Sequence, residues 1–191
     1  MHGASKGKNV KLRREIPIAI RECMNHEGLH GALVSHGSST VPQYIVDEIN
    51  ALGGAIQNAY GISKEELKAV IPCGISKINV DTDIRLAVTR NLRELFRDRP
   101  ELKTDARIGG VWELLDKNRA AFDPRAFLPP LMDTVMYGTG DDGTVALITD
   151  AMRRGVREAV GTLIVEFGSV GRAPLVELAG LDEMAARYAK E

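Results

Sequence analysis

Polar side chains gather at the end of a short apolar strand in the middle of the chain. Residues 75–80 have strand character, and Asn79 and Asp81 stand at its end. Thr82 or Asp83 can then cap the N-terminus of the helix that follows. In parallel α/β structures, groups at the carboxyl end of a strand face the substrate, and a helix N-terminus attracts anions. These residues would suit a phosphorylated, hydroxylated substrate, and a strand end with an acidic helix cap is the alternative.

A second strand end contains a histidine. Residues 29–34 are apolar and run into a polar loop that holds His36, and both His36 and His2 stand directly before a glycine. Imidazoles on loops at strand ends can ligate a divalent cation, and glycine lets the backbone approach a ligand. A catalytic zinc site usually has three protein ligands and an open position, so two histidines do not complete one. Ordinary loop histidines are the alternative interpretation.

Alternating strands and helices would have to position these two clusters. The order of predicted elements in the first half of the chain indicates parallel α/β units, and the remainder is predicted to be helical. Ser63 and Glu66 form a predicted capping box, and residues 98–110 are predicted to be a polar connection. Strands are predicted over residues 29–34 and 75–80, and helices over 12–24, 41–52, 63–70, 84–96, 111–115, 145–167 and from Pro174.

Composition narrows the functional classes. The chain has 191 residues, of which 44% are hydrophobic and 27% are charged, as expected of a soluble protein with a sizeable core. A net charge of −1 without a basic stripe argues against nucleic-acid binding. No apolar run is long enough to span a membrane and no signal peptide is recognisable, so we expect a cytoplasmic location. Cys23 and Cys73 lack the spacing of a disulfide framework or zinc site and are expected in the core.

Four motifs follow one another along the chain, with a fifth near its end. They are His2-Gly3 with Lys6 and Asn9-Val10-Lys11-Leu12, then Ser35-His36-Gly37-Ser38-Ser39-Thr40-Val41-Pro42, Lys77-Ile78-Asn79-Val80-Asp81-Thr82-Asp83, Phe122-Asp123-Pro124-Arg125 and Glu166-Phe167-Gly168-Ser169-Val170-Gly171. In this order and spacing they resemble the class II, metal-dependent fructose-1,6-bisphosphate aldolases. The resemblance covers nearly the whole chain, and the HGSST loop is closer to the subtype with HGSSS than to the subtype with HGGSG.

The resemblance implies an α/β fold, part of a (β/α)8 TIM barrel. Only the C-terminal half of the family is matched, and such barrels typically have roughly 250 residues. We therefore expect one domain, with C-terminal barrel strands and helices over 1–97 and a helical extension over 98–191. The family's catalytic Asp and its Asp-His pair are missing, so no catalytic residue is assigned. Met1 directly before His2 suggests an internal start or an incomplete reading frame, and we expect a truncated, inactive copy.

The resemblance also implies a metal and substrate site. His2 and His36 correspond to two of the three metal-ligating histidines, and the third is missing. The cofactor implied is Zn²⁺ or another divalent cation, together with a monovalent cation. The residues implied in substrate binding form two groups. Those for the ketone half, dihydroxyacetone phosphate, are Gly3, Gly37 and Ser39 with Lys6 beside them for its phosphate, and Asn79, Asp81 and Thr82 for its hydroxyls and phosphate. Arg85 and Arg125 are implied for the other phosphate.

The activity implied is reversible cleavage of fructose 1,6-bisphosphate into dihydroxyacetone phosphate and glyceraldehyde 3-phosphate. The implied partners are a phosphorylated ketose and, for a full-length parent, further copies in a dimer or tetramer; neither nucleic acid nor membrane is expected. A tagatose- or sedoheptulose-bisphosphate aldolase and a non-catalytic half-barrel interaction module are the alternatives. Because an opened barrel exposes a strand edge, we expect the isolated chain to associate or to be poorly soluble.

Overall fold

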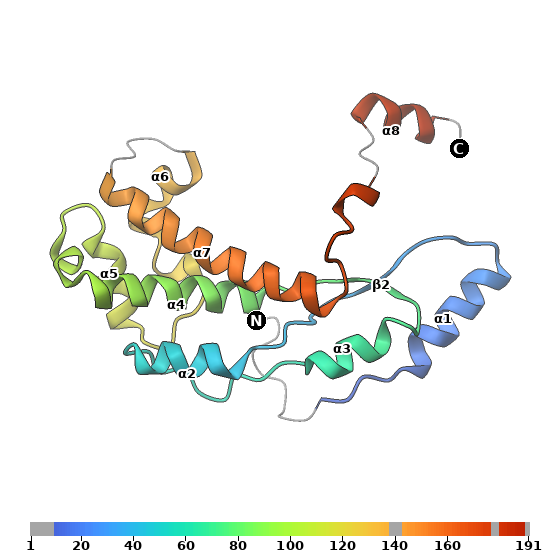
Figure 1. The fold of residues 1–191 in the computed structure, drawn as a ribbon, viewed down its shortest axis with the longest axis horizontal. Coiled ribbons are helices and arrows are strands. Elements are labelled where there is room, and N and C mark those ends of the chain that lie inside the picture. The colour runs from blue at the N-terminus through green and yellow to red at the C-terminus, as the bar shows by residue number, and fades with distance from the viewer. Residues whose placement is uncertain (1–9, 138–142, 177–179, 190–191) are drawn as a thin grey trace.

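The computed structural model describes residues 10–137, 143–176 and 180–189 (Figure 1). Helices dominate this part of the chain, and two short strands lie between them. The elements are α1 (Glu15–His26), β1 (Leu33–Ser35), α2 (Gln43–Ala51), α3 (Lys64–Val70), β2 (Ile75–Ile78), α4 (Thr82–Asp98), η1 (Pro100–Thr104), α5 (Gly109–Lys117), η2 (Pro124–Ala126), η3 (Pro129–Leu131), α6 (Met132–Tyr137), α7 (Gly143–Glu166), η4 (Ala173–Leu175) and α8 (Leu181–Tyr188).

The two strands form a parallel pair, as the sequence predicts. Leu33 lies opposite Ile75 and Ser35 opposite Ile78, with an irregularity in register after Leu33. Both strands are shorter than predicted. They are also not buried on both faces, because the side chain of Val34 is 40% exposed. A parallel strand normally has a neighbour on each edge and cover on each face, and β1 has a described neighbour only at β2.

The main core lies between α4 and the helices that follow it. Leu92 and Phe96 of α4 pack with Ile148 of α7 in a fully buried cluster, and α7 lies along α4 in Figure 1. Gly155 allows this approach, since a Cβ there would stand 2.6 Å from the carbonyl oxygen of Ala87. The predicted long helix at 145–167 is therefore confirmed, and glycine permits close packing within it.

The predicted polar connection at 98–110 is wrong. It contains the 3-10 helix η1, and Leu102 and Ile108 are buried in the same core as α4. Charged residues outnumber apolar ones in this stretch, yet Leu102 in η1 and Ile108 directly before α5 both pack into this core. A smaller cluster covers the other side of α4, where Ile45 and Ile49 of α2 contact Leu86.

Two local expectations need correction. Ser63 caps α3 by accepting a hydrogen bond from the Glu66 N–H at 3.2 Å, but Glu66 does not complete a capping box. Its carboxylate instead accepts from the Lys11 Nζ and the Leu12 N–H, which lie before α1. Cys23 is exposed and Cys73 is half-buried, so neither is a core residue. Cys23 lies on a face of α1 that nothing in the described structure covers.

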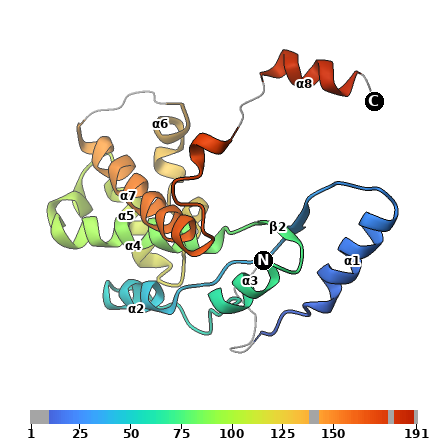
Figure 2. The ribbon, with the colours of Figure 1, turned by 45° about the vertical axis from the view of Figure 1, so that its right-hand side comes forward.

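The helix α8 stands away from the other helices in both views (Figures 1 and 2). Leu181 at its start is 88% exposed. No helix in the described residues is long and apolar enough to cross a bilayer.

Candidate functional site

The loop after β1 caps the N-terminus of α4. The hydroxyl oxygen of Ser39 accepts hydrogen bonds from the N–H groups of Asp81 and Thr82, at 3.1 and 3.0 Å. Thr82 or Asp83 was expected to cap this helix, and neither does. A capping group from a distant segment leaves no local pattern in the sequence. The Ser39 hydroxyl thereby joins the two predicted strand-end clusters.

Asp83 fastens the same loop from the other side. Its Oδ1 accepts from the N–H groups of Thr40 and Val41, both at 2.9 Å, and its Oδ2 accepts from the Thr40 hydroxyl at 2.7 Å. Burial raises the pKa of Asp83, although these hydrogen bonds oppose the shift. Val41 has φ of +52°, a left-handed conformation that β-branched residues avoid, and Asp83 holds its N–H there.

Two glycines shape the loop around Ser39. Gly37 has φ of +65°, which favours glycine, directly after His36. Gly61 passes so close that a Cβ would lie 2.2 Å from the Ser39 carbonyl oxygen. Sequence reasoning found Gly37 through its motif. It missed Gly61, because no local pattern marks a contact between two loops.

His36 and Asn79 lie side by side at the carboxyl ends of the two strands. The Asn79 Nδ2 is 3.0 Å from the His36 Nδ1, and the Asn79 Oδ1 accepts from the Lys77 Nζ at 2.6 Å. Main-chain bonds between Asn79 and the residues Ser35 and Ser38 extend the parallel pairing into the loops. His36 and Asn79, from the two predicted strand-end clusters, are therefore in contact.

Two predicted phosphate ligands, Arg85 and Arg125, converge on Asp123. Arg85 pairs with Asp81 at 2.7 Å and also contacts Asp123, which accepts from the Arg125 Nη2 at 2.6 Å. The hydrogen bonds from Arg125 and the nearby charge of Arg85 hold the pKa of Asp123 below its usual value. Asp123 belongs to one of the sequence motifs, but no role was predicted for it. Its position two residues before Arg125 could have indicated an ion pair.

A cavity of about 360 Å³ lies beside these arginines at the start of α4. Two guanidinium groups and a helix N-terminus suit a phosphate, which would have to compete with Asp123 for the arginines. Besides Asp81, Thr82, Arg85, Asp123 and Arg125, the lining includes Asn118, Ala120, Ala121, Phe122 and Ala126.

The described residues do not complete a metal site. No group of three histidine, cysteine or acidic side chains in the described ranges could hold an ion. His36 is one potential ligand, and metal binding at its Nε2 would need the tautomer with a proton on Nδ1. The group that faces Nδ1 is the donor Nδ2 of Asn79, so that tautomer would also need the Asn79 carboxamide to turn and present its oxygen. His2, Gly3 and Lys6 lie outside the described residues, so their predicted roles stay predictions.

Comparison with known proteins decides the family. The family model for class-II fructose-bisphosphate aldolase matches residues 1–171. The chain belongs to this family. A relative from Thermus caldophilus named fructose-bisphosphate aldolase is 35% identical over 172 residues, which are 90% of this chain and 42% of the relative. A relative from Synechocystis sp. named fructose-bisphosphate aldolase class 2 is 34% identical, over 99% of this chain and 42% of the relative. A relative from Cereibacter sphaeroides named fructose-bisphosphate aldolase 2 is 30% identical, over 98% of this chain and 42% of the relative.

Membership of the class II aldolase family has consequences for the fold and for metal dependence. The class II aldolase family implies a TIM-barrel-like α/β fold, and the parallel pair β1 and β2 fits a part of it. Members of the family generally depend on a divalent metal. The chain spans about 42% of the length of these curated relatives, and the matched part is their C-terminal half.

Proposed function

We propose that this chain provides the part of a class II fructose-bisphosphate aldolase that holds the ketone-phosphate half of fructose 1,6-bisphosphate. The contact between His36 and Asn79, beside the α4 N-terminus capped by Ser39, carries the proposal. It brings together, from two strand ends, the side chains that the family resemblance assigns to metal and substrate.

The described residues would bind and orient the substrate. The Asn79 carboxamide and the exposed Asp81 carboxylate can exchange hydrogen bonds with sugar hydroxyls, close to the positive N-terminal end of α4. Ser39 and Asp83 hold both loops, so the binding groups need little rearrangement. Binding energy from the phosphates can then position the bond between the reacting carbons.

Arg85 and Arg125 would bind the second phosphate in this proposal. Guanidinium groups pair with phosphate through two parallel hydrogen bonds, and both arginines line the cavity at the start of α4. In the complete protein, His2 and His36 would be two ligands of a zinc or other divalent cation, which supplies the charge stabilisation typical of metal-dependent lyases. A homo-oligomer of the complete protein belongs to the same proposal.

The chain alone should have no appreciable aldolase activity. The family's proton-transferring Asp is missing, and general acid–base catalysis contributes about 10²–10⁴-fold to rates. A coupled assay on the purified, metal-loaded chain tests this expectation. Turnover close to that of an intact relative would contradict it.

Calorimetric titration with fructose 1,6-bisphosphate tests the binding role. Arg125→Ala should weaken binding by roughly tenfold or more, since charge-assisted hydrogen bonds are lost. Arg153→Ala is the matched control: Arg153 is 73% exposed and pairs with Asp150, as Arg125 is 76% exposed and pairs with Asp123. Equal effects of both substitutions would refute the assignment of Arg125.

Sugar bisphosphates that share the ketone half remain the second candidate substrates. Most of the described predicted ligands belong to that half, so tagatose and sedoheptulose bisphosphates would make the same contacts. Titration with each bisphosphate in turn ranks them, and the tightest binder identifies the substrate class.

A further inference from the structure

We propose that Thr89 and Arg93 are positioning residues that fix the segment 115–123 against α4, and thereby keep one wall of the cavity in place when a phosphate binds there. The proposal rests on the proposed function, which assigns this cavity to the second phosphate. It deepens that function by giving a physical basis for selectivity toward sugars that carry two phosphates. Neither Thr89 nor Arg93 lines the cavity, so both act through other residues.

The cavity has two walls. The start of α4 supplies Asp81, Thr82 and Arg85, and the segment 118–126 supplies the other lining residues. A side-chain contact between Arg85 and Asp123 joins the two walls directly. A phosphate that binds Arg85 would break this contact, because it competes with Asp123 for the guanidinium. The second wall therefore needs contacts with α4 that the ligand does not disturb.

Thr89 provides one such contact, a single turn along α4 from Arg85. Its hydroxyl donates to the carbonyl oxygen of Phe122 at 3.0 Å, and the residue is 0% exposed. Threonines within helices can instead donate to a carbonyl of the preceding turn, as Thr149 and Thr162 do in α7. The hydroxyl of Thr89 thus leaves its own helix and holds the residue directly before Asp123.

Arg93 provides the second contact, one further turn along the same face of α4. Its Nη2 donates to the carbonyl oxygens of Leu115 and Arg119, at 2.9 and 3.4 Å, and the residue is 1% exposed. Leu115 lies in the last turn of α5, where carbonyl oxygens lack partners within the helix and a positive charge is favourable. Arg93 therefore joins the end of α5 to the loop that leads to Asp123.

Stability alone does not account for an arginine at position 93. In the described structure its Nε and Nη1 have no hydrogen-bond partner, and unpaired polar groups are costly when buried. An apolar side chain could fill the same space without these unpaired groups. The guanidinium is explained instead by the two carbonyl oxygens that it holds behind the cavity wall.

A division of roles along α4 follows from this geometry. Arg85, Thr89 and Arg93 are spaced four residues apart on one face, and only Arg85 lines the cavity. The other two bond buried main-chain carbonyls, which a phosphate does not contact. When a phosphate displaces Asp123, Arg125 therefore stays opposite Arg85, and the second phosphate binds with little rearrangement.

Calorimetric titration of the full chain with fructose 1,6-bisphosphate and with dihydroxyacetone phosphate tests the positioning role. Thr89→Val keeps the shape of the side chain, removes its hydroxyl and should weaken bisphosphate binding about threefold to tenfold. Binding of dihydroxyacetone phosphate should stay within about twofold, because its predicted ligands lie outside the segment 115–123. Thr89→Ser retains the hydroxyl and should keep bisphosphate binding within about twofold of the unsubstituted chain.

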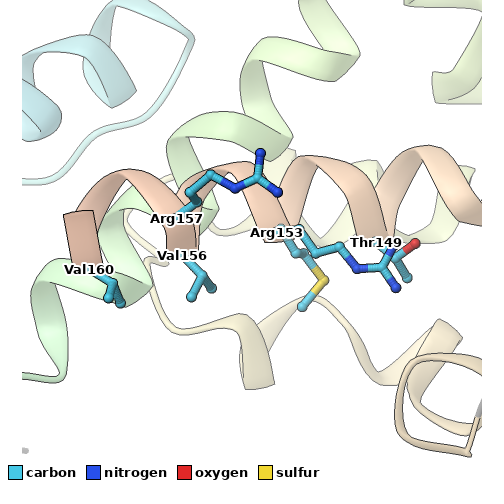
Figure 3. A pocket seen from close by; sticks show the side chains of 6 residues that line it. Thr149, Arg153, Val156, Arg157 and Val160 are labelled. Atoms are coloured by element: carbon cyan, nitrogen blue, oxygen red, sulfur yellow. The ribbon is translucent and has the colours of Figure 1, made fainter. Parts of the chain in front are cut away.

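Arg93→Met should show the same selective loss, and two controls accompany it. Arg157→Met removes the same charge from an exposed position on α7 (Figure 3). Asn91→Ala removes a buried amide of α4 that donates to the Ala87 carbonyl of the same helix. Both controls should leave the ratio of the two affinities within about twofold. Circular dichroism checks that each variant folds as the unsubstituted chain does.

Hydrogen exchange without any ligand reports the wall itself. Exchange in residues 118–126 should become faster in Thr89→Val than in the unsubstituted chain, and Asn91→Ala should not produce this local change. This measurement separates the positioning role from the assignment of the cavity to a phosphate.

Three results would overturn the proposal. One is bisphosphate binding by Thr89→Val as tight as that of the unsubstituted chain. Another is an equal weakening of both ligands in Thr89→Val, which would make the residue structural only. The third is unchanged exchange in residues 118–126 of that variant. Absence of bisphosphate binding by the unsubstituted chain would count against the proposed function, and faster exchange in Thr89→Val would then still support the hold of Thr89 on the wall.

Discussion

Removing the Asp83 carboxylate should release the loop that carries His36 and Ser39. In Asp83→Ala the N–H groups of Thr40 and Val41 lose their acceptor at a site where Asp83 itself is 4% exposed. Hydrogen bonds to a charged group contribute about 1.5–3 kcal/mol each. Two lost main-chain bonds therefore predict a fall of at least about 3 kcal/mol in the free energy of unfolding.

Asp83→Asn tests the contribution of the hydrogen bonds separately from that of the negative charge. Both main-chain N–H groups donate to Oδ1, which an asparagine retains, and the Thr40 hydroxyl can turn to accept from the new Nδ2. This variant should lose about 1 kcal/mol or less. Because the pKa of Asp83 is raised in the folded protein, its ionisation costs stability as pH rises above 3.8 and through the folded value. The asparagine variant should therefore improve relative to the unsubstituted chain over that range.

Urea denaturation followed by circular dichroism measures both variants, and hydrogen exchange at Thr40 and Val41 reports the loop. Asp98→Ala is a control, since its carboxylate is 56% exposed in a pair with Arg97 and should contribute little. The reasoning would be refuted if Asp83→Ala lost less than about 0.5 kcal/mol, or if alanine and asparagine were equally damaging.

Three further predictions concern the core, the acid range and the open edge. Gly155→Ala should lower the free energy of unfolding by about 1–3 kcal/mol, because the new Cβ would stand 2.6 Å from the Ala87 carbonyl oxygen. Gly161→Ala in the same helix has free space for its Cβ and should raise the free energy of unfolding by up to about 1 kcal/mol. Urea titrations of the two variants compare these values. The lowered pKa of Asp123 stabilises the fold above pH 3.8 and that contribution is lost as pH falls through the folded value, so Arg125→Ala should flatten the acid part of a stability–pH curve. Light scattering should show that the isolated chain associates and that Ile20→Asp reduces this association, and a monomer with a cooperative melt would contradict the expectation.

The elements that could be predicted were those with regular periodicity. The apolar spacing of α4 and α7 marks both helices, and the alternation of strands with helices indicates the parallel pair. The burial of Leu102 was missed because a single 3-10 turn has too few residues to show a period. The exposure of Cys23 was missed because sequence pattern identifies an apolar helix face but not whether anything covers it.

The residues of the candidate site also divide into those that the sequence predicts and those that it does not. His36, Asn79 and Arg125 stand in motifs and were predicted from them. Ser39 was assigned to a phosphate, and the structure adds that it caps α4 from a distant loop. Asp83, Asp123 and Gly61 act through contacts between segments far apart in the chain, which a single sequence does not reveal.

Titration of the isotopically labelled chain with dihydroxyacetone phosphate, followed by NMR, tests the central claim most directly. If the chain holds the ketone-phosphate half of the sugar, saturable shifts should concentrate in residues 36–41 and 79–85. Asn79→Ala should abolish these shifts, and Asn118→Ala, in the lining of the cavity beside Arg85, should retain those of the first loop. Millimolar affinity suffices for this measurement. Shifts confined to α1 or α7, or a full response in Asn79→Ala, would contradict the account.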